Sequence, residues 1–148
     1  MSEKILKRFA KKVGYSMEEI ALFKEGDPRL RQMRKLAEAA PRYSIEARVI
    51  KGKNCNTGYK TGDRFILDVD GNFLTKLCPP KMCVYLTSQL IVPVALINER
   101  LSESLDPNNF HFMHFVRCLD AGVECAGYGE VMLEVKAVPR VKIPSVSG

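Results

Sequence analysis

The sequence lacks a hydrophobic run long enough to cross a membrane. Its most apolar stretch, residues 84–97, is interrupted by Thr87, Ser88, Gln89 and Pro93. It falls short of the ~20 apolar residues that a membrane-spanning helix needs. We therefore expect a core helix in this stretch and no membrane partner.

A secretory signal and a paired set of cysteines are also missing. The first residues, MSEKILKR, are charged and periodic instead of apolar, and the cysteine count of 5 is odd. Secreted disulfide frameworks carry a signal and usually an even number of cysteines. We therefore expect the cysteines to be reduced and the protein to be cytoplasmic.

The chain has no internal repeat and no low-complexity tract, and its composition is that of a folded domain. Of its 148 residues, 46% are hydrophobic and 27% are charged. A chain of this length buries roughly two-thirds of its unfolded surface without help from disulfides or metal. We therefore expect it to fold on its own.

The formal net charge of +6 is concentrated near the N-terminus, where residues 1–40 contain ten Lys or Arg and six Asp or Glu. Clustered basic residues can bind nucleic acid. Here acids are interleaved with the bases, and no aromatic pattern for base stacking accompanies them. We therefore do not expect nucleic acid as a partner. Docking of a protein partner or of a second copy on residues 1–41 is the alternative.

The hydrophobic period changes once along the chain. Helical spacing predicts helices over residues 2–13, from Ser16 onward, and from Asp27-Pro28 to Pro41. Apolar residues then alternate with polar ones, which predicts strands, and further apolar runs bring the number of expected strands to five. These strands cover residues 43–49, 65–69, 73–77, 110–118 and 131–137. We expect the run 110–118, apolar on both faces, to be a central strand.

These elements predict an α+β fold with a small antiparallel or mixed sheet of about five strands packed on one central helix. We expect that helix to run from residue 79 to about residue 92, where Pro93 ends or kinks it. The domain organisation would be an N-terminal helical arm over residues 1–41, the α+β domain over 42–138 and a flexible tail over 139–148.

The main candidate for chemistry is Cys78, which directly precedes Pro79-Pro80 at the expected start of that helix. A cysteine at a helix N-cap faces unpaired N–H groups and the positive end of the helix dipole, which lowers the thiol pKa. Lys76 and Lys81 would act in the same direction. The alternative is that Cys78 is a small buried hydrophobe, as free cysteines often are.

A metal site is a second candidate, because Cys55, Cys118 and Cys125 fall at loop or strand ends and could meet Cys78 at one rim of the sheet. Structural zinc sites usually contain C-x2-C pairs, whereas the local spacings here are C-x4-C and C-x6-C. Cys83 is expected to point away from a ligand bound at Cys78. The spacing therefore favours reduced thiols with no cofactor over a zinc or iron–sulfur site.

The two histidines, His111 and His114, would lie on opposite faces of a strand. They are therefore not expected to bind one metal together. His114 is more readily a hydrogen-bonded core histidine, but it could also serve as a base for Cys78. In the enzymatic alternative Cys78 is a nucleophile or redox thiol, assisted by His114 or Asp63.

The cysteine segments resemble a family of small bacterial and archaeal proteins whose function is uncharacterised. The resemblance rests on three motifs, CNTGYKTGDRF from Cys55, Leu77-Cys78-Pro79, and Cys118-Leu-Asp120. It covers residues 45–138, about two-thirds of the chain. It implies that Cys55, Cys78 and Cys118 share a site, with Gly58, Gly62, Asp63 and Asp120 around them, and it brings no reaction with it.

The leading hypothesis from the sequence is therefore a cytoplasmic accessory or binding protein whose ligand or metal is held by Cys55, Cys78 and Cys118. The first alternative is an enzyme or enzyme subunit that uses Cys78. The second is a docking scaffold without a site, in which residues 1–41 bind a larger protein or a second copy.

Overall fold

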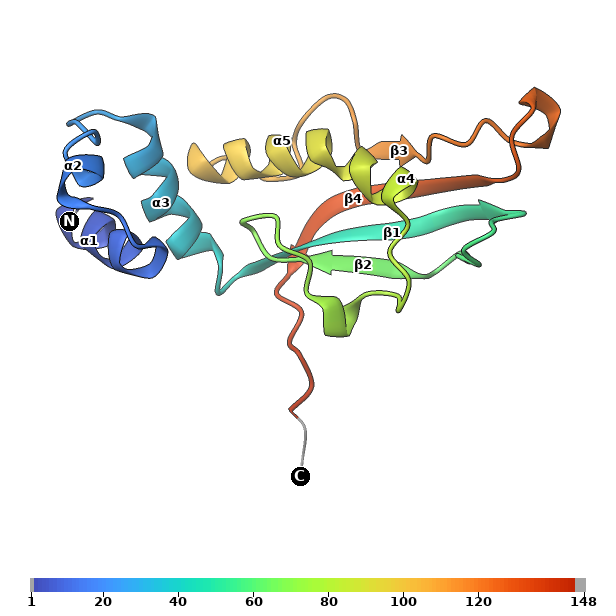
Figure 1. Cartoon of the computed structure of the whole chain (residues 1–148), viewed down its shortest axis with the longest axis horizontal. Helices are drawn as coiled ribbons and strands as arrows, with labels where there is room; N and C mark the ends of the chain where they lie inside the picture. The colour runs from blue at the N-terminus through green and yellow to red at the C-terminus, as the bar shows by residue number, and fades with distance from the viewer. Residues whose placement is uncertain (1, 146–148) are drawn as a thin grey trace.

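The computed structural model describes residues 2–145 and has an α+β fold with one antiparallel sheet (Figure 1). The sheet has four strands in the order β2-β1-β4-β3. They are β1 (Tyr43–Lys53), β2 (Arg64–Leu67), β3 (Phe115–Arg117) and β4 (Glu130–Pro139). The α-helices are α1 (Ser2–Val13), α2 (Met17–Ile20), α3 (Pro28–Ala39), α4 (Val84–Thr87) and α5 (Ile91–Ser102). Three short 3-10 helices are η1 (Thr75–Leu77), η2 (Ser88–Leu90) and η3 (Val123–Cys125).

The N-terminal arm forms from the local signals that predict it. Ser16 caps α2 through a capping box, with its side chain accepting from the Glu19 N–H and the Glu19 carboxylate accepting from the Ser16 N–H. Asp27 is the N-cap of α3 and Pro28 its first residue. α2 is shorter than expected, ending at Ile20 instead of near residue 25. The arm is therefore three helices joined by short turns.

The core lies between one face of the sheet and the helices that cover it. β1 pairs with β4 over most of its length, with Ala47 opposite Val135. Alternation then places Ile45, Ala47 and Val49 on the same buried face. Ile97 of α5 and Leu36 of α3 belong to the same buried cluster. The third helix of the arm therefore shares its core with the sheet.

Two of the five expected strands are not formed as expected. Residues 73–77 make one isolated bridge, Leu67 to Phe73, and then turn into η1. The run 110–118 contributes only β3, which is an edge strand and not a central one. Met113 has a φ of 72°, a left-handed conformation that interrupts an extended backbone. The central position is taken by β4 instead.

The expected helix over residues 79–92 is also wrong in its limits. α4 begins at Val84, and the helical path continues through η2 into α5, which ends at Ser102. Pro79 is itself followed by Pro80, which pushes it toward extended conformations, so Pro79 cannot be the first residue of a helix capped by Cys78. Pro93 is buried in the first turn of α5, where its missing N–H costs nothing, and so it does not end the helix.

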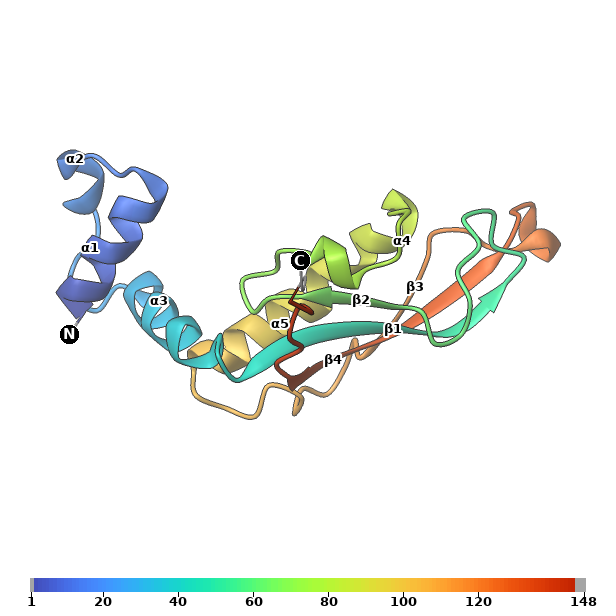
Figure 2. The same cartoon turned by 90° about the horizontal axis from the view of Figure 1, so that it is seen from below.

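The molecule is elongated, with the helical arm at one end and the loops that follow β1 and precede β4 at the other (Figure 2). Residues 140 and 141, in the expected tail, are hydrogen-bonded to the start of β1, the Arg140 N–H to the Arg42 carbonyl and the Val141 N–H to Ser44 Oγ. Residues 146–148 of that tail lie outside the described part. Within residues 2–145, no helix has the length and apolar character needed to span a bilayer.

Candidate functional site

A cavity of about 1040 Å³ lies at the loop end of the sheet, and cysteines from four separate segments line it. Cys55 follows β1, Cys83 precedes α4, Cys118 follows β3, and Cys125 ends η3. Cys55, Cys83 and Cys118 are half-buried, whereas Cys125 is exposed. We call this the thiol cavity. Its remaining lining includes Tyr59, Tyr85, Leu119 and Tyr128.

Tyr59 holds Cys83 in this position. The Tyr59 hydroxyl accepts a hydrogen bond from the Cys83 N–H at 2.8 Å and donates one to the Lys81 carbonyl at 2.7 Å. Burial raises the pKa of Tyr59 against the smaller, opposing effect of the hydrogen bond from the Cys83 N–H. The segment before α4 is therefore fixed to the loop that carries Cys55.

Asp120 organises the loop that carries Cys125. Its carboxylate accepts hydrogen bonds from the N–H groups of Gly122 and Tyr128 through Oδ1, and of Gly129 through Oδ2. These three backbone donors lower the pKa of Asp120. Both carboxylate oxygens are therefore used to hold the backbone.

Two glycines allow this loop to pack closely. A Cβ at Gly127 would lie 2.1 Å from Oδ1 of Asp120, and one at Gly129 would lie 2.3 Å from the carbonyl oxygen of Asn54. Side chains do not tolerate such approaches, so only glycine fits. Gly127 is thus required by close packing within the loop before β4, and Gly129 by contact between that loop and the loop after β1.

Cys78 lies elsewhere, against the outer edge of β2. Its Sγ contacts the Ile66 N–H at 3.4 Å and the Ile66 carbonyl at 3.5 Å. Cys78 is the C-cap residue of η1. Burial raises the pKa of its thiol, and the hydrogen bond from the Ile66 N–H has a smaller, lowering effect. The expectation that Cys78 caps the start of a helix is therefore wrong, and burial opposes formation of the thiolate there. Cys83 is the residue at a helix N-cap.

The two proposed assistants of Cys78 do not contact it. The Asp63 carboxylate accepts from the Lys60 N–H in the turn that leads into β2. The His114 ring stacks on Phe110 at 3.8 Å between centroids and bonds to the Phe110 carbonyl through Nε2. His114 directly precedes β3, whereas Cys78 lies against β2, so they belong to opposite edges of the sheet.

The cavity brings together Cys55 and Cys118 of the expected triad, with Cys83 in the place of Cys78. Across residues 2–145, no three His, Cys, Asp or Glu side chains are arranged closely enough to hold a single metal ion. No Lys, Arg or His is among the described residues that line the cavity. Lys51 and Arg117 lie outside this lining and pair with Glu130, which belongs to it.

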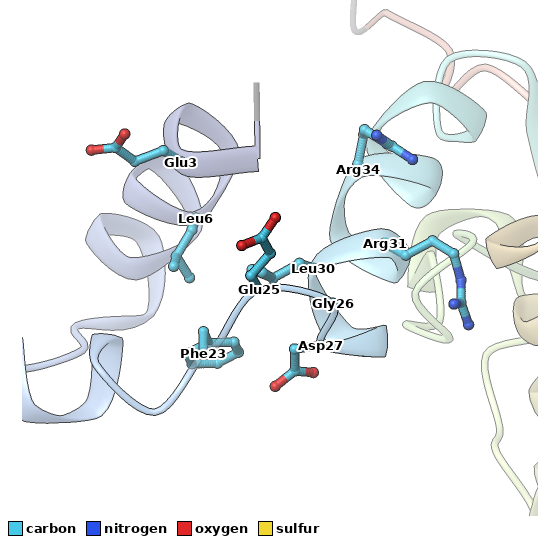
Figure 3. Close-up of a pocket in the computed structure, with 9 residues that line it drawn as sticks. All are labelled: Glu3, Leu6, Phe23, Glu25, Gly26, Asp27, Leu30, Arg31 and Arg34. Carbon is cyan, nitrogen blue, oxygen red and sulfur yellow. The ribbon is translucent and has the colours of Figure 1, made fainter.

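A smaller cavity of about 550 Å³ lies within the arm, between α1 and α3 (Figure 3). Leu6, Phe23 and Leu30 form its apolar part. Arg31 and Arg34 also line it, but Figure 3 shows their side chains extending away from α1, and Arg31 pairs with Glu103 after α5. This arrangement serves packing of the arm, and we assign no site to it.

Comparisons of the chain with protein-family models, with curated proteins and with solved structures found no match. The site is therefore argued from its own geometry. Sequence reasoning missed Cys83, Tyr59 and the two close-packed glycines. The glycines on either side of Tyr128 were the one sequence feature that pointed to close packing there. Spacing along the chain does not show which loops meet in the fold.

Proposed function

We propose that this chain is a cytoplasmic binding protein that holds a thiophilic metal centre in the thiol cavity. The observation that carries the proposal is the convergence of four cysteines from four segments on one cavity. Thiolates bind zinc and iron–sulfur clusters, and iron–sulfur clusters commonly use four cysteines.

Four thiols on one cavity suit a cluster better than a single ion. A single zinc ion draws its sulfur ligands close together, because each Zn–S bond is only about 2.3 Å long. The described residues show no such close group. A cluster separates its cysteine sulfurs more widely, since its own iron and sulfide atoms lie between them.

The lining also supports binding over catalysis. Nucleophilic cysteines are activated by a base, a cation or a helix N-terminus. The described lining contains no Lys, Arg or His, and the helix that Cys83 caps has only four residues. Tyr59 and Asp120 are already engaged with backbone groups. A bound metal would itself deprotonate the thiols.

Purification without oxygen, followed by metal analysis and a visible spectrum, tests the proposal. We expect iron and acid-labile sulfide after anaerobic reconstitution, and sulfur-to-metal charge transfer when Co²⁺ is added as a probe for a single-ion site. Iron binding without sulfide, or Co²⁺ binding alone, would assign a single ion instead of a cluster. No metal with five titratable thiols would overturn the proposal.

Serine variants identify the ligands. Cys55→Ser, Cys83→Ser and Cys118→Ser should each weaken metal retention by at least about tenfold. Cys78→Ser is the matched control, because Cys78 lies against β2 and outside the cavity. Loss of metal in Cys78→Ser with retention in Cys83→Ser would restore the triad of Cys55, Cys78 and Cys118.

A further inference from the structure

A second large cavity, of about 1140 Å³, lies at the opposite end of the molecule. It is bounded by α1, α3, the start of β1 and the residues that follow β4 (Figure 2). Its floor consists of apolar side chains from the two helices, namely Ile5, Phe9, Met33, Leu36, Ala37 and Ala40. We call this cavity the basic groove, because of the residues at its rim.

Five cations line the groove, and they come from three separate segments of the chain. They are Arg8 and Lys12 of α1, Arg42 before β1, and Arg140 and Lys142 after β4. The ion pairs found among residues 2–145 include none of these five. None of the five makes a direct ion pair within the described chain, although Lys12 lies near enough to Asp70 to lower the pKa of that carboxyl against the larger, raising effect of burial.

Only two carboxylates line the same groove, Asp68 and Asp70. The Asp68 carboxylate accepts hydrogen bonds from the N–H groups of Asp70 and Asn72 and from the Asn72 side chain. It therefore serves the turn after β2. The groove retains an excess of positive charge over an apolar floor.

The cations after β4 are held in place by the backbone. The Arg140 N–H donates to the Arg42 carbonyl at 3.0 Å, and the Val141 N–H donates to Ser44 Oγ at 2.9 Å. Arg42 also stacks its guanidinium over the Tyr43 ring, 5.1 Å from the centroid. This side of the rim is thus ordered before any partner binds.

We propose that the basic groove docks an acidic amphipathic helix of a partner protein. An apolar floor between two helices is the surface that receives the apolar face of a third helix. Cations from three segments match several carboxylates spaced along a partner, whereas one lipid or phosphate headgroup would need them to converge on a single point. A second copy of this chain is disfavoured, because each copy has a net charge of +6.

The probe is a synthetic peptide of about 18 residues with Leu on one helical face and Glu on the other. Binding to the full chain is measured by fluorescence anisotropy. We expect Kd below about 100 µM, weakening as salt is raised. The same residues in scrambled order, and a peptide with Lys in place of Glu, should bind at least about tenfold more weakly.

Charge reversal locates the site. Arg8→Glu with Lys12→Glu should weaken binding of the acidic peptide at least about tenfold, because both side chains line the groove. Lys11→Glu with Lys24→Glu is the matched control, since both residues are exposed, lie outside the groove and change the net charge equally. All four positions are exposed, so circular dichroism should show an unchanged fold.

Three results would overturn the proposal. One is equal weakening by the two double variants, which would mean diffuse attraction to a basic chain. Another is failure of the acidic peptide to bind. The third is tighter binding of oleate, of phosphatidylglycerol vesicles or of a short DNA duplex. None of these results depends on the thiol cavity, so this proposal and the metal proposal fail separately.

Discussion

The hydroxyl of Tyr59 accepts a hydrogen bond of 2.8 Å from the backbone N–H of Cys83. This bond joins the loop after β1 to the residues that precede α4, which are 24 positions apart in the sequence. It fixes Cys83 beside the segment of Cys55. The thiol cavity therefore depends on a side chain that carries no sulfur.

Replacing Tyr59 by Phe should destabilise the protein and loosen Cys83. The ring still packs, but the Cys83 N–H and the Lys81 carbonyl lose their partner, at a cost of about 1–3 kcal/mol. Urea unfolding measures the cost, and the alkylation rate of Cys83 should rise. Tyr85→Phe is the control, because Tyr85 lines the same cavity but is 64% exposed. Equal stability of the two variants would contradict the structural role of the Tyr59 hydroxyl.

Cys78 should react slowly with alkylating reagents. Burial raises the pKa of its thiol and the chain around Ile66 covers it, so the thiolate is scarce at neutral pH. In metal-free protein we expect modification of Cys78 at pH 7 to be at least about tenfold slower than that of exposed Cys125. Quantitative mass spectrometry after timed iodoacetamide treatment compares the two sites. Preferential labelling of Cys78 below pH 7 would instead support an activated thiol there.

Glu46 should make stability depend on pH in the acid range. Its side chain is 5% exposed and pairs with Arg48 at 3.1 Å and Arg64 at 3.0 Å. Burial raises its pKa, but the hydrogen bonds from the two arginines outweigh burial and lower the pKa of Glu46 below its ordinary value. The contribution is therefore complete above the unfolded-state pKa, ~4.3, and is lost as pH falls through the lower folded-state value.

Glu46→Gln tests this contribution. The variant should lose about 1–2 kcal/mol at pH 7, because the two arginines are themselves half exposed and solvent screens the pair. The difference from the parent should shrink as pH falls below 4, which chemical denaturation at several pH values would show. A difference that stays constant down to pH 3 would mean that ionisation of Glu46 is not its source.

Gly129→Ala should disrupt the thiol cavity. The new Cβ would lie 2.3 Å from the carbonyl oxygen of Asn54 and 2.8 Å from that of Lys53, and neither backbone group can move freely. We expect a loss of about 1–3 kcal/mol, together with weaker metal retention. Gly14→Ala is the control. The φ of Gly14 is 85°, which a residue with a side chain rarely adopts, but a Cβ there would meet no neighbouring atom within 4 Å. That variant should lose stability without losing metal, and equal metal loss in both would refute the contact.

The sequence predicted the parts of the fold that local chemistry governs. The capping box at Ser16 and the Asp27-Pro28 start of α3 follow from side chains within three residues of each other. The alternation in β4 follows from burial of one face of the strand, whereas in β1 Ser44 and Glu46 on the opposite face are buried as well. These elements are determined locally, because each signal and the backbone it acts on lie within a few residues.

The site was decided by tertiary structure. The family resemblance grouped Cys78 with Cys55 and Cys118, but in the fold the Cys78 thiol lies against β2. Cys83 enters the cavity because Tyr59 bonds to its N–H, and Gly129 lets the last loop close against Asn54. Such contacts join residues far apart in the chain, and a one-dimensional pattern carries no information about which loops meet.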